Sequence, residues 1–92
     1  MSAEANVIFR DAVPNVAGVV VFGLGGFFSV HKQMPSAGRT IRSVRRFSKQ
    51  KYAIRYAVGF LEGRAKIAGV NYVPGAGKDT MLFKPVGIDI QP

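Results

Sequence analysis

The chain has 92 residues, with 13 Lys and Arg against 5 Asp and Glu, so its formal net charge at pH 7 is +8. It contains no Cys and one His, which excludes disulfides, thiolate metal sites and a Cys nucleophile. The acidic residues are scattered along the chain, so their spacing indicates no paired-carboxylate site. We therefore expect a single-domain protein that is not an enzyme and has no metal, no cofactor and no small-molecule substrate.

An N-terminal segment, residues 1–11, precedes the longest uncharged stretch of the chain, which runs from Ala12 to Val30 and predicts a transmembrane helix over residues 12–31. A helix of 19 residues is about 28 Å long, close to the hydrocarbon thickness of a bilayer. The interior glycines favour this interpretation, because Gly is more frequent in membrane helices than in other helices. A buried helix of a globular domain, or a Val-rich strand followed by a turn, is the alternative for the same residues.

A stripe of mostly small residues would lie on one face of that helix. Its members are Gly18, Phe22, Gly25 and Ser29. Gly25 and Ser29 form a small-xxx-small pair, which lets the backbone of a second helix approach closely. The stripe predicts a helix-packing contact with a neighbouring span; the alternative is that it faces lipid.

The remaining segments complete a mainly α prediction: one N-terminal transmembrane helix, a basic amphipathic helix and an extended C-terminal tail. Residues 32–39 contain Pro, Ser and Gly and predict a turn. Apolar residues recur at helical spacing over 40–68, where Gly59 and Gly63 are either close packing points or weak spots. Residues 69–92 are rich in Pro and Gly and predict the tail. No second span is expected, because the most apolar part of 40–68 is too short and contains Arg55.

The positive charge is concentrated after the predicted span. Arg42, Arg45, Arg46 and Lys49 fall within two turns of the predicted amphipathic helix. Such a helix can lie on an anionic lipid such as cardiolipin, contact an acidic partner, or bind nucleic acid. The charge asymmetry also predicts an N-terminus outside the membrane and a C-terminus inside, by the positive-inside rule. Because orientation and lipid contact explain the asymmetry directly, we favour lipid or an acidic partner over nucleic acid.

Two glycine-rich stretches resemble nucleotide-binding motifs and fail on spacing. PGAGKD lacks the first Gly and the final Ser or Thr of a phosphate-binding loop, since Tyr72 and Asp79 occupy those positions. VVVFGLGGFF has Phe28 at the third glycine position of the dinucleotide fingerprint. We expect neither motif to bind a nucleotide.

The layout resembles the small single-span accessory subunits of mitochondrial inner-membrane respiratory complexes. Locally, Met81-Leu82-Phe83-Lys84 is similar to the tail of a small accessory subunit of complex I, the proton-pumping NADH dehydrogenase. This resemblance implies a non-catalytic, structural role in assembly or stability, with other membrane subunits as partners. It also implies a single pass through the mitochondrial inner membrane, with the N-terminus in the intermembrane space and the C-terminus in the matrix.

Other assignments remain open from the sequence. One is a subunit of the ATP synthase or of a bacterial or viral membrane assembly. The alternative from a different class is a basic RNA-binding protein, such as a component of an organellar ribosome.

Overall fold

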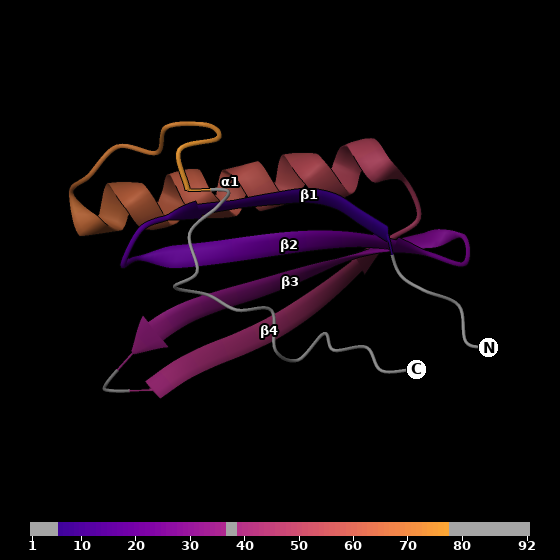
Figure 1. Cartoon of the computed structure of the whole chain (residues 1–92), viewed down its shortest axis with the longest axis horizontal. Helices are drawn as coiled ribbons and strands as arrows, with labels where there is room; N and C mark the ends of the chain where they lie inside the picture. The colour runs from indigo at the N-terminus through magenta and orange to yellow at the C-terminus, as the bar shows by residue number, and fades with distance from the viewer. Residues whose placement is uncertain (1–5, 37–38, 78–92) are drawn as a thin grey trace.

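A four-stranded antiparallel sheet with one helix on one of its faces forms the described part of the chain (Figure 1). The computed structural model describes residues 6–36 and 39–77. Its elements, in chain order, are β1 (Asn6–Val13), β2 (Ala17–Leu24), β3 (Phe27–Ser36), β4 (Arg39–Phe47) and α1 (Gln50–Ala68). The strands lie in the order β1-β2-β3-β4, so that β1 and β4 are the two edges.

Two tight turns set the register of the first three strands. Pro14, Asn15 and Val16 join β1 to β2, with Val16 N–H donating to the Val13 carbonyl at 2.9 Å and Asn15 at φ 67°. Pro followed by a residue with positive φ is the pattern of a type II turn. Gly25 and Gly26 join β2 to β3, both with positive φ. Two such residues make the type I′ turn, whose twist matches that of the flanking strands.

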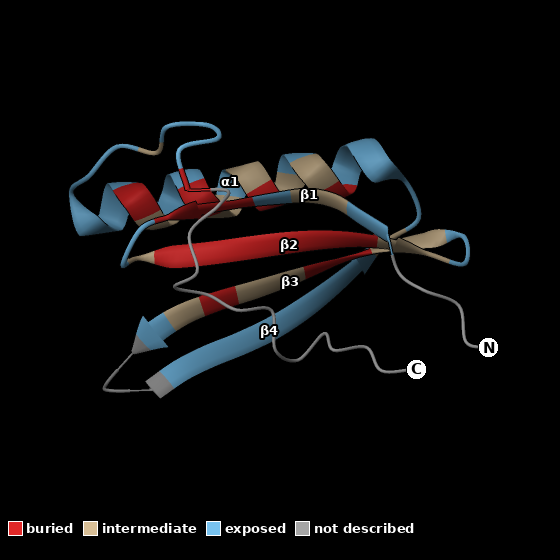
Figure 2. Cartoon of the chain, in the orientation of Figure 1, coloured by how far each residue is buried: buried red, intermediate tan, exposed pale blue. Residues whose placement is uncertain are grey.

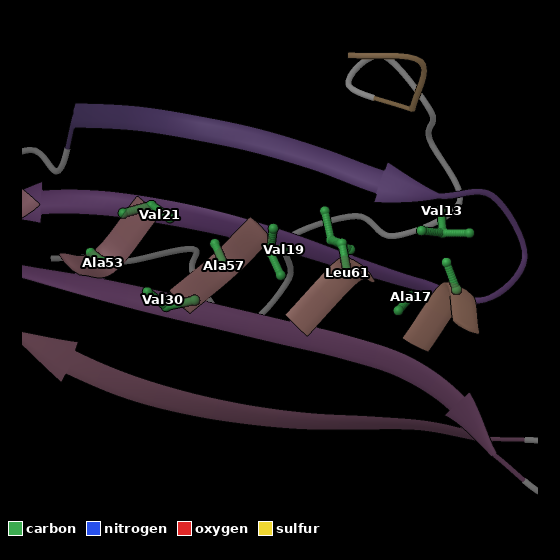
Figure 3. Close-up of a cluster of buried hydrophobic side chains, with 9 residues drawn as sticks. Val13, Ala17, Val19, Val21, Val30, Ala53, Ala57 and Leu61 are labelled. Carbon is green, nitrogen blue, oxygen red and sulfur yellow. The ribbon is translucent and has the colours of Figure 1, made fainter. Parts of the chain in front are cut away.

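The hydrophobic core lies between the helix and the sheet (Figure 3). Its sheet residues are Val13, Ala17, Val19, Val21 and Val30. Its helix residues recur every fourth position: Ala53, Ala57, Leu61 and Ala65. Three of these four are Ala, so the helix backbone can approach the valines of the sheet closely. Leu61, Val21 and Val30 are the largest fully buried side chains among the described residues.

The end of α1 is defined by its backbone. Gly69 has φ 75°, a left-handed conformation that favours Gly. Gly69 N–H donates to the Lys66 carbonyl and Val70 N–H to the Ala65 carbonyl, which is the Schellman pattern. The helix therefore stops at Ala68, and residues 70–77 turn back over the end of β1.

The prediction of a mainly α fold with a transmembrane helix is wrong. Residues 12–31 form the end of β1, all of β2 and the start of β3. The uncharged run arises because every residue of Ala17–Phe22 is buried, so β2 shows no alternation of polar and apolar residues (Figure 2). The uncharged turn of Gly25 and Gly26 then joins this strand to the apolar start of β3.

No helix in the described part of the chain has the length and apolarity needed to cross a membrane. The single-pass location in the mitochondrial inner membrane, and the membrane and respiratory-chain assignments derived from it, are therefore not supported. The accessory-subunit role remains an untested prediction, although the transmembrane helix on which it was based is not present in the described residues.

The other predicted segments also differ from the structure. β3 continues to Ser36, so the predicted turn at 32–39 covers the last residues of β3 and the first of β4. The predicted amphipathic helix at 40–68 is helical only from Gln50, because its first part is strand β4. Of the predicted tail, 69–77 is a loop, whereas 78–92, with Met81-Leu82-Phe83-Lys84, lies outside the described residues.

Replacing Gly59 and Gly63 together with Ala is expected to stabilise the protein. Both glycines are exposed, and a Cβ added at either would meet nothing within 4 Å, so among the described residues they are weak spots rather than packing points. Each substitution should raise the free energy of unfolding by about 0.5–1 kcal/mol, measured by denaturant titration. Gly69→Ala is the matched control and should lower it, because φ there is 75°. A double variant less stable than the wild type would contradict this assignment.

Candidate functional site

The edge strand β4 is exposed over most of its length (Figure 2). Every residue from Thr40 to Arg46 is exposed, and within the described part of the chain β4 pairs on one side only, with β3. The helix packs mainly against β2 and β3 and contacts β4 much less. Among the described residues, nothing covers the two faces or the outer backbone edge of β4 from Thr40 to Arg46.

Arginines occupy both faces of β4. Arg42 and Arg46 are the register partners of Gln33 and Ser29, on the sheet face away from the helix. Arg45 pairs with Val30, a core residue, and so lies on the helix side. Because successive side chains of a strand point to opposite faces, neighbouring arginines are separated onto the two sides of one edge.

Aromatic rings lie against the cationic groups of this edge. The guanidinium carbon Cζ of Arg46 is 5.0 Å from the centre of the Phe27 ring. Cζ of Arg45 is 5.1 Å from the centre of the Tyr56 ring and 5.4 Å from that of Phe47. These are cation–π distances, which fix the arginine side chains while their exposed N–H groups remain able to donate.

The positive surface continues past β4 into the start of α1. Lys49 caps the helix with its backbone and is exposed. Lys51 and Arg55 follow it, and their charged ends are 5.3 and 5.8 Å from the centre of the Tyr52 ring. We call β4 and this first part of α1 the basic edge; its exposed cations are Arg42, Arg45, Arg46, Lys49, Lys51 and Arg55.

Carboxylates are scarce in the described residues. These residues include eleven Lys and Arg but only two acidic residues, Asp11 and Glu62. Asp11 is buried at the other side of the sheet, in β1, and Glu62 lies in the second half of α1. Neither belongs to the basic edge.

A second cation–aromatic cluster adjoins the basic edge on the helix side. Lys32 of β3 is half-buried, and its Nζ donates a hydrogen bond to the Tyr56 hydroxyl of α1. The same Nζ is 5.7 Å from the centre of the Phe60 ring. The hydrogen bond and charge of Lys32 lower the pKa of Tyr56 and outweigh its burial, and Arg45 adds to this lowering.

His31 lies on the face away from the helix, beside Arg46. Its Nε2 is 3.2 Å from the Ser29 hydroxyl oxygen, and its ring meets the Phe22 ring edge-on, with centroids 5.3 Å apart. Burial lowers the pKa of His31, and the positive charge of Arg46 lowers it further. Both effects favour the neutral imidazole.

The glycine-rich loop at 74–77 already binds a carboxylate of the same chain. Gly75 N–H donates to Asp11 Oδ2 at 2.8 Å and Gly77 N–H donates to Asp11 Oδ1 at 3.2 Å. Tyr72 donates its hydroxyl to Oδ2 at 2.5 Å, and Ala12 N–H donates to Oδ1 at 2.9 Å. These donors are therefore engaged by the Asp11 carboxylate of the same chain.

This carboxylate is held in its ionised form. Burial by itself raises the pKa of Asp11, but the hydrogen bonds from Tyr72 and the three backbone amides lower it below its ordinary value. Burial and the neighbouring carboxylate raise the pKa of Tyr72. Asp11 therefore fastens the loop after α1 to strand β1, and this cluster is structural.

The residues predicted to form a helix-packing stripe do not form one. Gly18 and Phe22 lie in β2, Ser29 lies in β3 as the register partner of Phe22, and Gly25 lies in the turn. Gly18, Phe22 and Ser29 are buried, on the sheet face away from the helix. The stripe was predicted from the spacing of residues in a helix, but three of these residues are in strands and Gly25 is in a turn, so they do not form a helix face.

The predicted basic residues do lie close together, on a different element. Arg42, Arg45 and Arg46 are in β4 and Lys49 is at the start of α1, rather than all on one helix. Binding of lipid or an acidic partner by these residues stays a prediction. The sequence did not indicate the contact between Lys32 and Tyr56, which are 24 residues apart. It also did not indicate the hydrogen bonds of Asp11 with the loop after α1, which join positions up to 66 residues apart.

The described residues contain no group of three His, Cys, Asp or Glu that could hold a metal ion. No protein-family model, curated protein or solved structure matches the chain.

Proposed function

We propose that this protein binds nucleic acid through its phosphate groups, with the basic edge as the contact surface. The observation that carries the proposal is the exposed edge strand, which bears Arg42, Arg45 and Arg46 on its two faces with aromatic rings against Arg45 and Arg46. Cationic side chains bind the phosphates of nucleic acids, and neighbouring aromatic rings can stack on bases.

The charge pattern supports a polyanion rather than a single acidic group. Six exposed cations follow one another from Arg42 to Arg55 along a strand and the helix after it, without a carboxylate among them. Arg42 and Arg46 are four residues apart on one face, about 13 Å at the rise of a strand. Cations at such spacing along a fixed element match a ligand with repeated negative charges.

Nucleic acid is favoured over a lipid surface because the arginines of β4 are distributed over both faces of the strand. A membrane is flat and contacts one face of a strand, whereas these arginines lie on both faces of β4. The rings of Phe27 and Tyr52 beside cations offer contacts to bases that a lipid headgroup does not use.

The test is a salt titration of binding to a fluorescently labelled single-stranded RNA, followed by anisotropy. If three to six of the cations contact phosphates, log Kobs should fall with log salt at a slope of about −2 to −4. Vesicles of neutral lipid with added anionic lipid serve as the comparison at the same salt concentrations. Absence of RNA binding at low salt, or equal affinity for the anionic vesicles, would overturn the proposal.

A further inference from the structure

We propose that Lys32, Arg45 and Tyr56 form a phosphate-binding subsite on the helix side of the basic edge, which a bound single strand reaches by crossing β4. The inference rests on the proposed function and adds to it a specific site and a preference for single-stranded ligands.

The subsite is built on three elements that the core holds in place. Lys32 is on β3, Arg45 on β4 and Tyr56 on α1. Tyr56 lies between the two cations: Lys32 Nζ donates to its hydroxyl oxygen, and Arg45 Cζ is 5.1 Å from its ring centre. The neighbouring Ala53 and Ala57 are completely buried against the sheet, which fixes this part of the helix.

The two cations lack a described carboxylate to balance them. Lys32 is half-buried, and the partners that the structure gives its Nζ are the hydroxyl of Tyr56 and the rings of Tyr56 and Phe60. A hydrogen bond from a lysine to a neutral hydroxyl leaves the positive charge uncompensated. An anion between Lys32 and Arg45 would compensate both charges through charge-assisted hydrogen bonds.

The donor set fits a phosphate group. Arginine offers a planar fork of N–H donors, lysine offers three donors at one point, and the tyrosine hydroxyl can donate its own proton while it accepts from Lys32. Two oxygens of a phosphate, each accepting more than one hydrogen bond, can satisfy these donors together. The group is either a phosphodiester of the backbone or a terminal phosphomonoester, which share this chemistry.

The positions of the arginines favour a flexible ligand. Arg42 and Arg46 lie on the sheet face away from the helix, whereas Arg45 and Lys32 lie on the helix side. A ligand that contacts both groups must bend around one strand. A double helix is stiff, with a persistence length of about 150 base pairs for DNA, so a duplex cannot bend around one strand, whereas a single strand of RNA can.

The experiment compares Lys32→Gln with the control Lys66→Gln. The control also removes one lysine charge, but from an exposed position in the last turn of α1. Binding of the single-stranded RNA and of its duplex is measured for each by anisotropy over a salt series. For the single strand, Lys32→Gln should lower the affinity about fivefold near 0.1 M salt and reduce the salt slope by about 0.7. Its affinity for the duplex, and both affinities of Lys66→Gln, should stay within about twofold of the wild type.

A spectroscopic readout tests the contact with Tyr56 directly. The phenolate absorbance is titrated against pH with and without the single strand, and Tyr56→Phe identifies the Tyr56 step. A bound phosphate should move that step to higher pH, because its negative charge disfavours the phenolate. Strands with a 5′-phosphate and with a 5′-hydroxyl distinguish the two phosphate sources: equal effects of Lys32→Gln assign a backbone phosphodiester, and an effect confined to the 5′-phosphate assigns a terminal group.

The outcomes separate this inference from the proposed function. If the wild type binds the single strand but Lys32→Gln binds it equally well, or the Tyr56 step does not move, the subsite is refuted and the basic edge stands. If the wild type binds no RNA, both proposals fall. Equal melting temperatures of Lys32→Gln and the wild type exclude misfolding as the cause of lost binding. A reduction of about twofold in the single-strand affinity of Tyr56→Phe would independently support a contact of the Tyr56 hydroxyl with the phosphate.

Discussion

The triple variant Arg42→Gln, Arg45→Gln and Arg46→Gln is expected to bind single-stranded RNA about 100-fold more weakly than the wild type near 0.1 M salt. Each phosphate contact to a single strand contributes about −0.7 to the slope of log Kobs against log salt. Removing three contacts should therefore reduce the slope by about 2 as well. The measurement is anisotropy with the same labelled strand over a series of salt concentrations.

Two matched variants show which property of the arginines matters. Replacing the same three residues with Lys keeps their charge but removes the planar guanidinium groups, two of which, those of Arg45 and Arg46, lie over aromatic rings. The Lys variant should keep the salt slope of the wild type and lose a smaller part of the affinity. Lys66→Gln should change neither property. A Gln variant that binds within threefold of the wild type would place the binding surface elsewhere.

An edge strand has another use for exposed charges. Arginines along β4 discourage edge-to-edge pairing with a strand of a second molecule. If this is their sole role, the Gln variant should aggregate while the fraction that remains monomeric binds RNA normally. Size-exclusion chromatography with light scattering, run on the samples used for anisotropy, distinguishes the two roles.

The predicted span shows why this fold is difficult to read from its sequence. Length and apolarity favoured a helix, but a strand buried on both faces, followed by an uncharged turn and another apolar strand, produces the same uncharged run. The turn residues carry the missing signal, because Gly25-Gly26 between apolar runs is typical of a two-residue hairpin. Pro14-Asn15 is a second turn signal in the same stretch.

The start of the predicted amphipathic helix failed for a similar reason. Ile41, Val44 and Phe47 are three residues apart, which resembles one face of a helix. In β4 they lie on opposite faces: Ile41 and Phe47 are on the helix side and Val44 is on the other. From Gln50 onward the spacing is unambiguous, because Ala53, Ala57, Leu61 and Ala65 recur every fourth residue with no conflicting alternation.

The candidate site could be predicted only where it is local in sequence. Arg42, Arg45, Arg46 and Lys49 are close in the chain, so they lie near one another in a helix or in a strand. The contact of Lys32 with Tyr56 depends on how α1 crosses the sheet, and the contact of Asp11 with residues 72–77 depends on where the chain returns after Gly69. Neither follows from spacing within one element.

Asp11→Asn is expected to lower the free energy of unfolding by about 3 kcal/mol at pH 7. The carboxylate accepts from the Tyr72 hydroxyl and from the amides of Ala12, Gly75 and Gly77. An Asn side chain keeps one acceptor oxygen and turns an NH₂ group toward the remaining donors, and each buried group left without a partner costs about 1–3 kcal/mol. Tyr72→Phe removes a single one of these hydrogen bonds and should cost about 1.5–3 kcal/mol. Both are measured by denaturant titration.

The pH dependence gives this prediction its sharpest test. The pKa of Asp11 in the folded protein lies below the ordinary value of 3.8, so more protons are bound to this group in the unfolded state. Stability from the carboxylate is thus complete above the unfolded pKa and is lost as the pH falls through the lower folded pKa. The difference between wild type and Asp11→Asn should stay constant from neutral pH to about pH 5 and shrink in more acidic solution. His31 also titrates, with a lowered pKa, but it is present in both proteins and cancels in the difference. A difference that is the same at acidic and neutral pH would mean that the Asp11 charge does not hold the loop to β1.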